Sequence, residues 1–128
     1  MTSDQMVQLE IKLSKNKEIL KDLLGDATIG GITKDTKVKI EKYKYQGVSL
    51  KLSNGLRIFT INIYELTNKV KKKALLLGYE LYPAIIDVNE ATCEVYGKDM
   101  TETVFTETTE PLVIITAYIW IYEKNKTK

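Results

Sequence analysis

The period of the hydrophobic pattern changes along this 128-residue chain, and that change constrains its fold more than any other feature. Between about Ser3 and Leu24, apolar residues recur every three or four positions, which is the period of an amphipathic helix. From Thr36 onward, apolar and polar residues alternate, which is typical of half-buried strands. Because both periods occur in one chain, the sequence predicts an α+β fold.

The first predicted element is a helix over Ser3–Leu24. Its apolar stripe comprises Met6, Leu9, Leu13, Leu20 and Leu24. Thr2 and Gln5 resemble a capping box, and Gly25 supplies a stop signal at the other end. A strand over residues 7–13 stays open as the alternative, because apolar and polar residues also alternate there.

An antiparallel meander is predicted next. Its strands cover Lys37–Tyr45, Val48–Leu52 and Leu56–Ile63, and its turns lie at Gln46-Gly47 and Asn54-Gly55. The Asn-Gly pair is the strongest turn signal in the chain, because both residue types tolerate positive φ. The pair therefore allows positive φ at both of these turn positions, which sets the register between the flanking strands.

A second helix is predicted over Tyr64–Leu77, with Gly78 as its stop. A strand over Tyr79–Val88 follows, and Pro83 marks it as an edge strand because proline cannot donate a ladder hydrogen bond. Two shorter strands are predicted at Thr92–Tyr96 and Thr101–Thr106.

The last predicted strand, Leu112–Tyr122, is apolar on both faces. Alternation places aliphatic residues on one face and Tyr118, Trp120 and Tyr122 on the other. This aromatic face has three interpretations: packing in the core, an oligomer or partner interface, and contact with bases or a flat ligand. The candidate protein interface is therefore Tyr118, Trp120 and Tyr122.

These elements predict a single α+β domain over residues 1–123. Its twisted antiparallel sheet, the meander plus the long C-terminal strand, would pack on the N-terminal helix and the second helix. The hydrophobic content of 44% is enough for one core. Residues 124–128 are expected to form a frayed polar tail.

Three scarcities in the composition limit the chemistry. The chain has no histidine, one cysteine (Cys93) and one arginine (Arg57). Serine or cysteine nucleophiles paired with histidine and imidazole zinc sites are therefore excluded for this chain alone, and no internal disulfide can form. A single thiol favours a reducing, cytoplasmic location. The longest apolar stretch, Leu112–Tyr122, is too short for a membrane helix, which needs about 20 residues.

Motifs for metal and cofactor binding are weak. Asp35-Thr36-Lys37 loosely resembles the acid and lysine pattern of magnesium nucleases, but Glu10-Ile11-Lys12 matches equally well. Asp87–Glu90 lacks the later ligands of a calcium loop and is better explained as a turn. No cofactor, metal or small-molecule substrate is therefore predicted, and a carboxylate or metal-dependent hydrolase ranks third among the functions considered.

Charge is divided unevenly along the chain. Residues 1–73 carry a net charge of +7, and residues 74–128 carry −5. The asymmetry would cancel if the halves interleave in one sheet. If it does not cancel, the acidic stretch from Glu80 to Glu110 would dock on a basic partner or on the basic half of a second copy, and a head-to-tail contact of that kind makes a ring or filament.

Lysines and tyrosines in the first half suggest a nucleic-acid surface as the alternative. Single-strand binders combine a positive groove with aromatic stacking platforms. The candidate patch is Lys42, Tyr43, Lys44, Tyr45, Lys69, Lys72 and Lys73.

The function ranked first is a non-catalytic protein-interaction or assembly module, with a protein partner or self-association as its mode of action. Sequence-independent binding of single-stranded nucleic acid ranks second. A small, lysine-rich chain without cofactor motifs is also typical of accessory proteins of phages or mobile elements.

Overall fold

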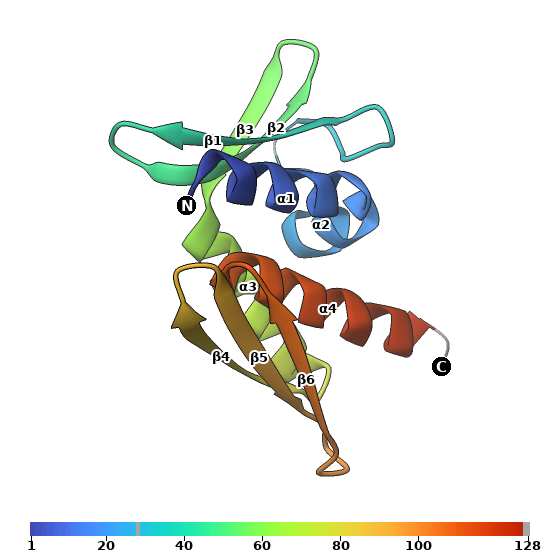
Figure 1. The fold of residues 1–128 in the computed structure, drawn as a ribbon. Coiled ribbons are helices and arrows are strands. Elements are labelled where there is room, and N and C mark those ends of the chain that lie inside the picture. Colours follow the sequence, from blue (N-terminus) through green and yellow to red (C-terminus); the bar gives the residue numbers. More distant parts are fainter. Residues whose placement is uncertain (28, 127–128) are drawn as a thin grey trace. The chain divides into compact units, whose positions relative to one another are not determined.

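The computed structural model describes residues 1–27 and 29–126, and within them the chain forms four helices and six strands (Figure 1). The α+β class and the packing of helices on sheets are confirmed. The strands form two three-stranded antiparallel sheets, one within residues 37–62 and one within residues 80–107, and not the one sheet expected. In each sheet the strands lie in the order of the sequence.

The residues group into two compact units, Met1–Leu66 and Thr67–Lys128. The first unit contains α1, α2 and the first sheet, and the second contains most of α3, the second sheet and α4. The expectation of one domain over residues 1–123 stays a prediction.

The N-terminal helical segment is two helices, α1 (Ser3–Ser14) and α2 (Lys17–Leu24), where one was expected. The predicted capping box at Thr2 is confirmed, since its side chain accepts a hydrogen bond from the backbone N–H of Gln5. The helix is interrupted at Asn16, whose side-chain amide donates to the carbonyl of Lys12 at 2.8 Å. A polar residue on the apolar stripe thus ends one helix and starts the next.

The first sheet is the predicted meander, formed by β1 (Lys37–Tyr43), β2 (Gly47–Asn54) and β3 (Arg57–Asn62). Helix α1 packs against β1. The carboxylate of Glu10 on α1 accepts the backbone N–H of Ile40 at 2.9 Å, which satisfies a donor on the edge strand. Leu50 and Leu52 of the central strand are fully buried.

The turn at Asn54-Gly55 is where predicted, but its conformation differs. Asn54 pairs with Arg57, so the two turn residues are Gly55 and Leu56, and only Gly55 has positive φ (59°). Asn54 instead ties the hairpin to the preceding loop: its amide donates to the carbonyls of Ile29 and Gly31 at 3.1 and 2.8 Å. Its side-chain oxygen accepts the hydroxyl of buried Thr36 at 2.7 Å.

Helix α3 (Ile63–Leu76) confirms the second predicted helix. It ends as expected at Gly78, which has a φ of 92°. The N–H of Tyr79 donates to the carbonyl of Ala74 at 2.9 Å, and the N–H of Gly78 donates to Leu75 at 3.0 Å. This pair of bonds is a Schellman motif, which needs the left-handed conformation that glycine adopts without strain.

The second sheet consists of β4 (Glu80–Asp87), β5 (Glu90–Tyr96) and β6 (Glu102–Glu107). Strand β4 contains Pro83 and is an edge strand, as predicted. One face of β5 is buried through Ala91, Cys93 and Val95, and the helix α4 packs on all three strands.

The predicted strand over Leu112–Tyr122 is wrong, because this segment lies within the helix α4 (Glu110–Lys126). Thr109 precedes the helix, and its hydroxyl accepts the N–H of Leu112 at 3.4 Å, as an N-terminal cap does. Pro111 occupies the first turn, where proline is tolerated. Helix α4 also continues through residues 124–126, which were expected to be a frayed tail. Residues 127 and 128 of that tail lie outside the described residues.

Candidate functional site

The helical conformation of α4 separates the aromatic residues that were assigned to one face. Tyr118 and Tyr122 are one turn apart, whereas Trp120 points in a nearly opposite direction. Tyr118 is fully buried, and Trp120 and Tyr122 are half-buried. A continuous aromatic face of Tyr118, Trp120 and Tyr122 therefore does not form, and the role of these residues as an interface stays a prediction.

Trp120 belongs to an aromatic cluster inside the second unit. Its ring lies 6.1 Å from that of Tyr79 in an edge-to-face arrangement and 5.8 Å from that of Phe105. The ammonium of Lys124 lies 4.5 Å from the centre of the Trp120 ring. These contacts join α4 to the second sheet and account for the position of Trp120 by packing.

The candidate nucleic-acid patch is divided between the two units. Lys42, Tyr43, Lys44 and Tyr45 lie on β1 and the turn after it, and Lys69, Lys72 and Lys73 lie on α3. Tyr45 is 92% exposed, and the ammonium of Lys44 lies 5.3 Å from the centre of its ring. Tyr43 is less exposed than Tyr45, and its hydroxyl donates to Glu41 at 2.7 Å.

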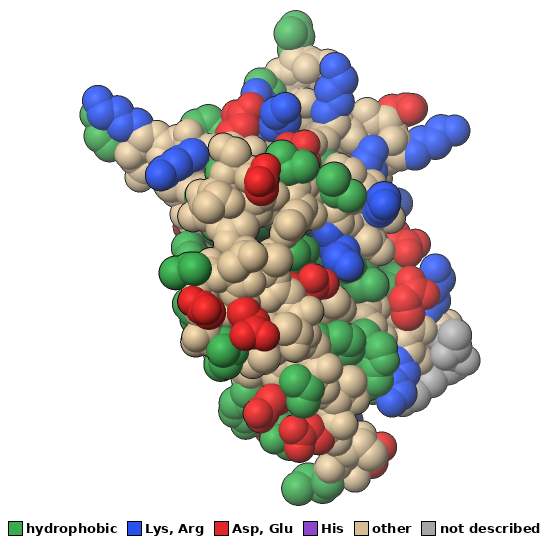
Figure 2. Space-filling model, viewed as in Figure 1, with side chains coloured by type: hydrophobic (Ala, Val, Ile, Leu, Met, Phe, Trp, Pro, Cys, Tyr) green, Lys and Arg blue, Asp and Glu red, His purple; other side chains and the backbone are tan. Residues whose placement is uncertain are grey.

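The charge asymmetry is smaller between the units than between the halves of the sequence. The first unit has ten lysines and Arg57 against eight acids, a net charge of +3, and the second has eight lysines against nine acids, a net charge of −1. The difference arises because the α3 lysines belong to the unit that carries the acidic strands. On the face seen in Figure 2, carboxylates are interspersed with hydrophobic side chains over those strands.

On the outer face of the second sheet, glutamate and tyrosine alternate both along a strand and between neighbouring strands. Tyr96 on β5 is opposite Glu80 on β4 and Glu102 on β6, and Tyr82 on β4 is opposite Glu94 on β5. Opposite residues on neighbouring strands point to the same side. The register therefore brings three carboxylates around two aromatic rings.

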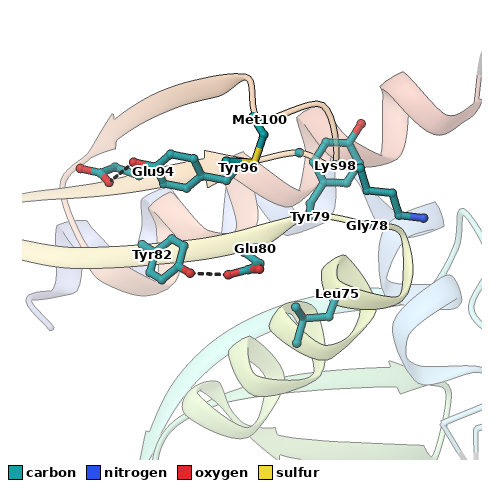
Figure 3. A pocket seen from close by; sticks show the side chains of 10 residues that line it. Leu75, Gly78, Tyr79, Glu80, Tyr82, Glu94, Tyr96, Lys98 and Met100 are labelled. Atoms are coloured by element: carbon teal, nitrogen blue, oxygen red, sulfur yellow. Dashed lines mark hydrogen bonds between the residues drawn. The ribbon is translucent and has the colours of Figure 1, made fainter.

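A groove of about 710 Å³ lies beside this face in the second unit (Figure 3). We call it the Tyr–Glu groove. It is lined by Leu75, Gly78, Tyr79, Glu80, Tyr82, Glu94, Tyr96, Gly97, Lys98 and Met100. The volume falls in the range of small-molecule and side-chain binding clefts.

Two of the three tyrosines that line the groove, Tyr82 and Tyr96, are each held by the glutamate two residues before them. The hydroxyl of Tyr82 donates to the carboxylate of Glu80, and that of Tyr96 donates to Glu94 at 3.0 Å. The two rings lie 5.5 Å apart at 78°. These contacts hold the rings in place and leave further lone pairs on both carboxylates for other donors.

The glutamates also raise the pKa of both tyrosines. The pKa of Tyr96 is raised to about 12, mainly by its hydrogen bond to Glu94, then by partial desolvation and by the charge of Glu102. The pKa of Tyr82 is raised chiefly by its hydrogen bond to Glu80. Near neutral pH, the groove therefore presents neutral rings beside negative carboxylates.

The loop between β5 and β6 forms one end of the groove. Asp99 accepts hydrogen bonds from the hydroxyl and the N–H of Thr101 at 2.7 and 3.2 Å. Met100 has a φ of 63° and is 85% exposed. The stem of Lys98 passes over Gly78, and its ammonium points away from Glu80 and Glu94 in Figure 3. The ammonium of Lys98 therefore leaves the carboxylates of Glu80 and Glu94 accessible.

Cys93 faces the buried side of β5. Burial raises the pKa of its thiol to about 11, although the backbone at Tyr82 and the charge of Lys71 act in the opposite direction. The thiol is therefore protonated near neutral pH, which suits a structural side chain. Among residues 1–27 and 29–126, no three side chains of the metal-ligating types lie close enough to hold a metal ion.

The Tyr–Glu groove was not found by sequence reasoning. The sequence shows the acidic stretch but does not by itself connect it with Tyr82 and Tyr96, because that connection depends on the pairing of β4 with β5. The pattern Glu-x-Tyr occurs in both strands, at Glu80 to Tyr82 and at Glu94 to Tyr96. In an exposed hairpin, this repeated spacing places like residues on one face and is the signal that could have been used.

Neither a search for membrane-spanning helices nor comparison with known proteins assigns a function to this chain. Within the described part of the chain, no helix has both the length and the apolar character needed to cross a bilayer. Comparison with protein-family models, with curated protein sequences and with solved structures finds no match to this chain.

Proposed function

We propose that this protein is a non-catalytic interaction module that docks on cationic, partly apolar protein surfaces through the Tyr–Glu groove. One observation carries the proposal: a groove of about 710 Å³ combines two ordered tyrosine rings with accessible carboxylates.

The composition of the groove favours an arginine or lysine side chain next to an apolar one. Cations are attracted to the faces of aromatic rings, and the effect is stronger where carboxylates lie beside them. Leu75 and Met100 supply apolar contact at the rim, where each is more than half exposed. A segment that carries both kinds of side chain therefore fits better than a purely charged one.

Replacing Glu94 by lysine is expected to weaken docking. The substitution removes one carboxylate, adds a repulsive charge and releases the hydroxyl of Tyr96, so binding should fall roughly tenfold. The probe is a capped hexapeptide of alternating leucine and arginine, titrated by calorimetry and by the fluorescence of Trp120, the single tryptophan.

Glu90→Lys is the matched control, because Glu90 is exposed on the same strand but does not line the groove. It makes the same change of charge and should bind the peptide as the unmodified chain does. Equal affinities of the Glu94→Lys and Glu90→Lys proteins would show that the groove is not the docking site.

Binding of single-stranded nucleic acid is a second candidate, supported by the exposed ring of Tyr45 beside Lys44. Stacking of a base on such a ring contributes about 1–3 kcal/mol. Tyr45→Ala should then weaken binding to a thymidine oligonucleotide about tenfold or more, whereas Lys42→Glu should reduce the salt dependence. Lys21→Glu on α2 is the charge control. No binding at about 50 mM salt would exclude this function.

A further inference from the structure

The tip of the β2–β3 hairpin, Gly55–Ile58, carries the features that the groove favours. The side chain of Leu56 is 100% exposed and that of Ile58 is 54% exposed. Between them in the sequence is Arg57, the single arginine of the chain, which is also exposed and whose guanidinium lies beside Gly30 of the preceding loop. The tip therefore combines a planar cation with two apolar side chains.

The base of this hairpin is held in place. Asn54 donates to two carbonyls of the preceding loop and accepts the hydroxyl of Thr36, so the tip projects from an anchored support. An anchored tip loses less conformational freedom on docking than a mobile loop, and this preorganisation favours association.

We infer that the β2–β3 tip of one copy of this protein inserts into the Tyr–Glu groove of another copy. The inference rests on the proposed docking function of the groove. Leu56 would lie against Leu75 and Met100, and the guanidinium of Arg57 would leave Gly30 and lie over a tyrosine ring. Its N–H groups would donate to the free lone pairs of Glu80 or Glu94.

The contact joins two different surfaces, since the tip belongs to the first unit and the groove to the second. Such a heterologous contact repeats from copy to copy and produces an open chain or a closed ring, in contrast to a symmetric pair. A single hairpin tip in one groove buries less than a standard interface, so the assembly is weak and reversible.

The test is sedimentation velocity of the full chain between about 20 µM and 1 mM, the range suited to a weak interface. The average mass should rise with concentration. Leu56→Asp should raise the dissociation constant at least about tenfold, because it places a charge in an apolar contact. Val88→Asp is the matched control: Val88 is 90% exposed at the β4–β5 turn and does not line the groove.

Mixing two defective variants distinguishes this contact from others. The Leu56→Asp protein keeps an intact groove, and the Glu94→Lys protein keeps an intact tip. Each alone should stay monomeric, and an equimolar mixture should form a one-to-one dimer that grows no further. Assembly that survives Leu56→Asp but not Glu94→Lys would overturn the inference, because another segment would then occupy the groove.

Failure of the inference and failure of the proposed function give different results. If the chain stays monomeric at all concentrations but binds the leucine-arginine peptide in a Glu94-dependent way, the tip is not the occupant and the docking function stands. If neither self-association nor peptide binding depends on Glu94, both are wrong.

Discussion

Replacing Tyr118 by alanine is expected to lower the free energy of unfolding by about 3–5 kcal/mol. Tyr118 is fully buried on α4, so the substitution removes a large ring and leaves a cavity. Small proteins are stable by about 5–15 kcal/mol, so this loss is a large fraction of the total. Urea unfolding followed by circular dichroism and by Trp120 fluorescence measures the change.

Two control substitutions show whether the loss of stability in Tyr118→Ala follows from burial of this residue in a helical α4. Tyr122→Ala should cost less than Tyr118→Ala, because Tyr122 is only half-buried, whereas the strand predicted from the sequence would have made the two residues equivalent. Tyr45→Ala removes a ring that is 92% exposed and should change stability by less than about 0.5 kcal/mol. If Tyr118→Ala does not fold, Tyr118→Phe keeps the ring and should lower the free energy of unfolding by only about 1 kcal/mol, the contribution of the hydroxyl.

Replacing Asn54 by alanine is expected to lower the free energy of unfolding by about 2–4 kcal/mol, because three hydrogen bonds are lost together. The hydroxyl of Thr36, which is fully buried, would also lose its acceptor. Amide exchange should quicken in the loop of residues 29–36, which Asn54 ties to the hairpin. Both effects are measured on one sample by denaturant unfolding and hydrogen exchange.

Asn68→Ala is the control for this prediction. Asn68 is exposed on α3, so the same change of side chain should alter stability by less than about 0.5 kcal/mol. If Asn54→Ala proved as mild as Asn68→Ala, the hairpin base would not depend on this side chain. The anchored tip invoked for self-association would then lose its support.

The two substitutions test different kinds of structural information. Asn54 was recognised in the sequence as part of a turn, but its amide acts on a loop more than 20 residues away in the chain. Tyr118 was recognised as part of an apolar segment, but with the wrong conformation. In both cases the residue was identified from local sequence, and its role depended on partners that are distant in sequence.

The α4 segment shows why local patterns were insufficient. Its β-branched residues and its alternation of aliphatic and aromatic side chains favour a strand, and a fully buried helix lacks the polar face that produces a helical period. Residues 111–115 at the start of α4 are all buried, so this part of the segment has no helical period of apolar and polar residues. The informative signal was local and was missed: Thr109 followed by Glu110 and Pro111 is typical of a helix start.

The sequence by itself determined the elements whose signals are chemical and local: the cap at Thr2, the meander with its turn near Gly55, and the helix that stops at Gly78. Caps and turns depend on a few adjacent residues, so they can be read without a partner. Only the tertiary structure decided that the strands form two sheets, that α4 is buried against all three strands of the second sheet, and that Tyr82 and Tyr96 share a groove with Glu80 and Glu94. These features depend on strand register and on burial by distant segments, which no local pattern specifies.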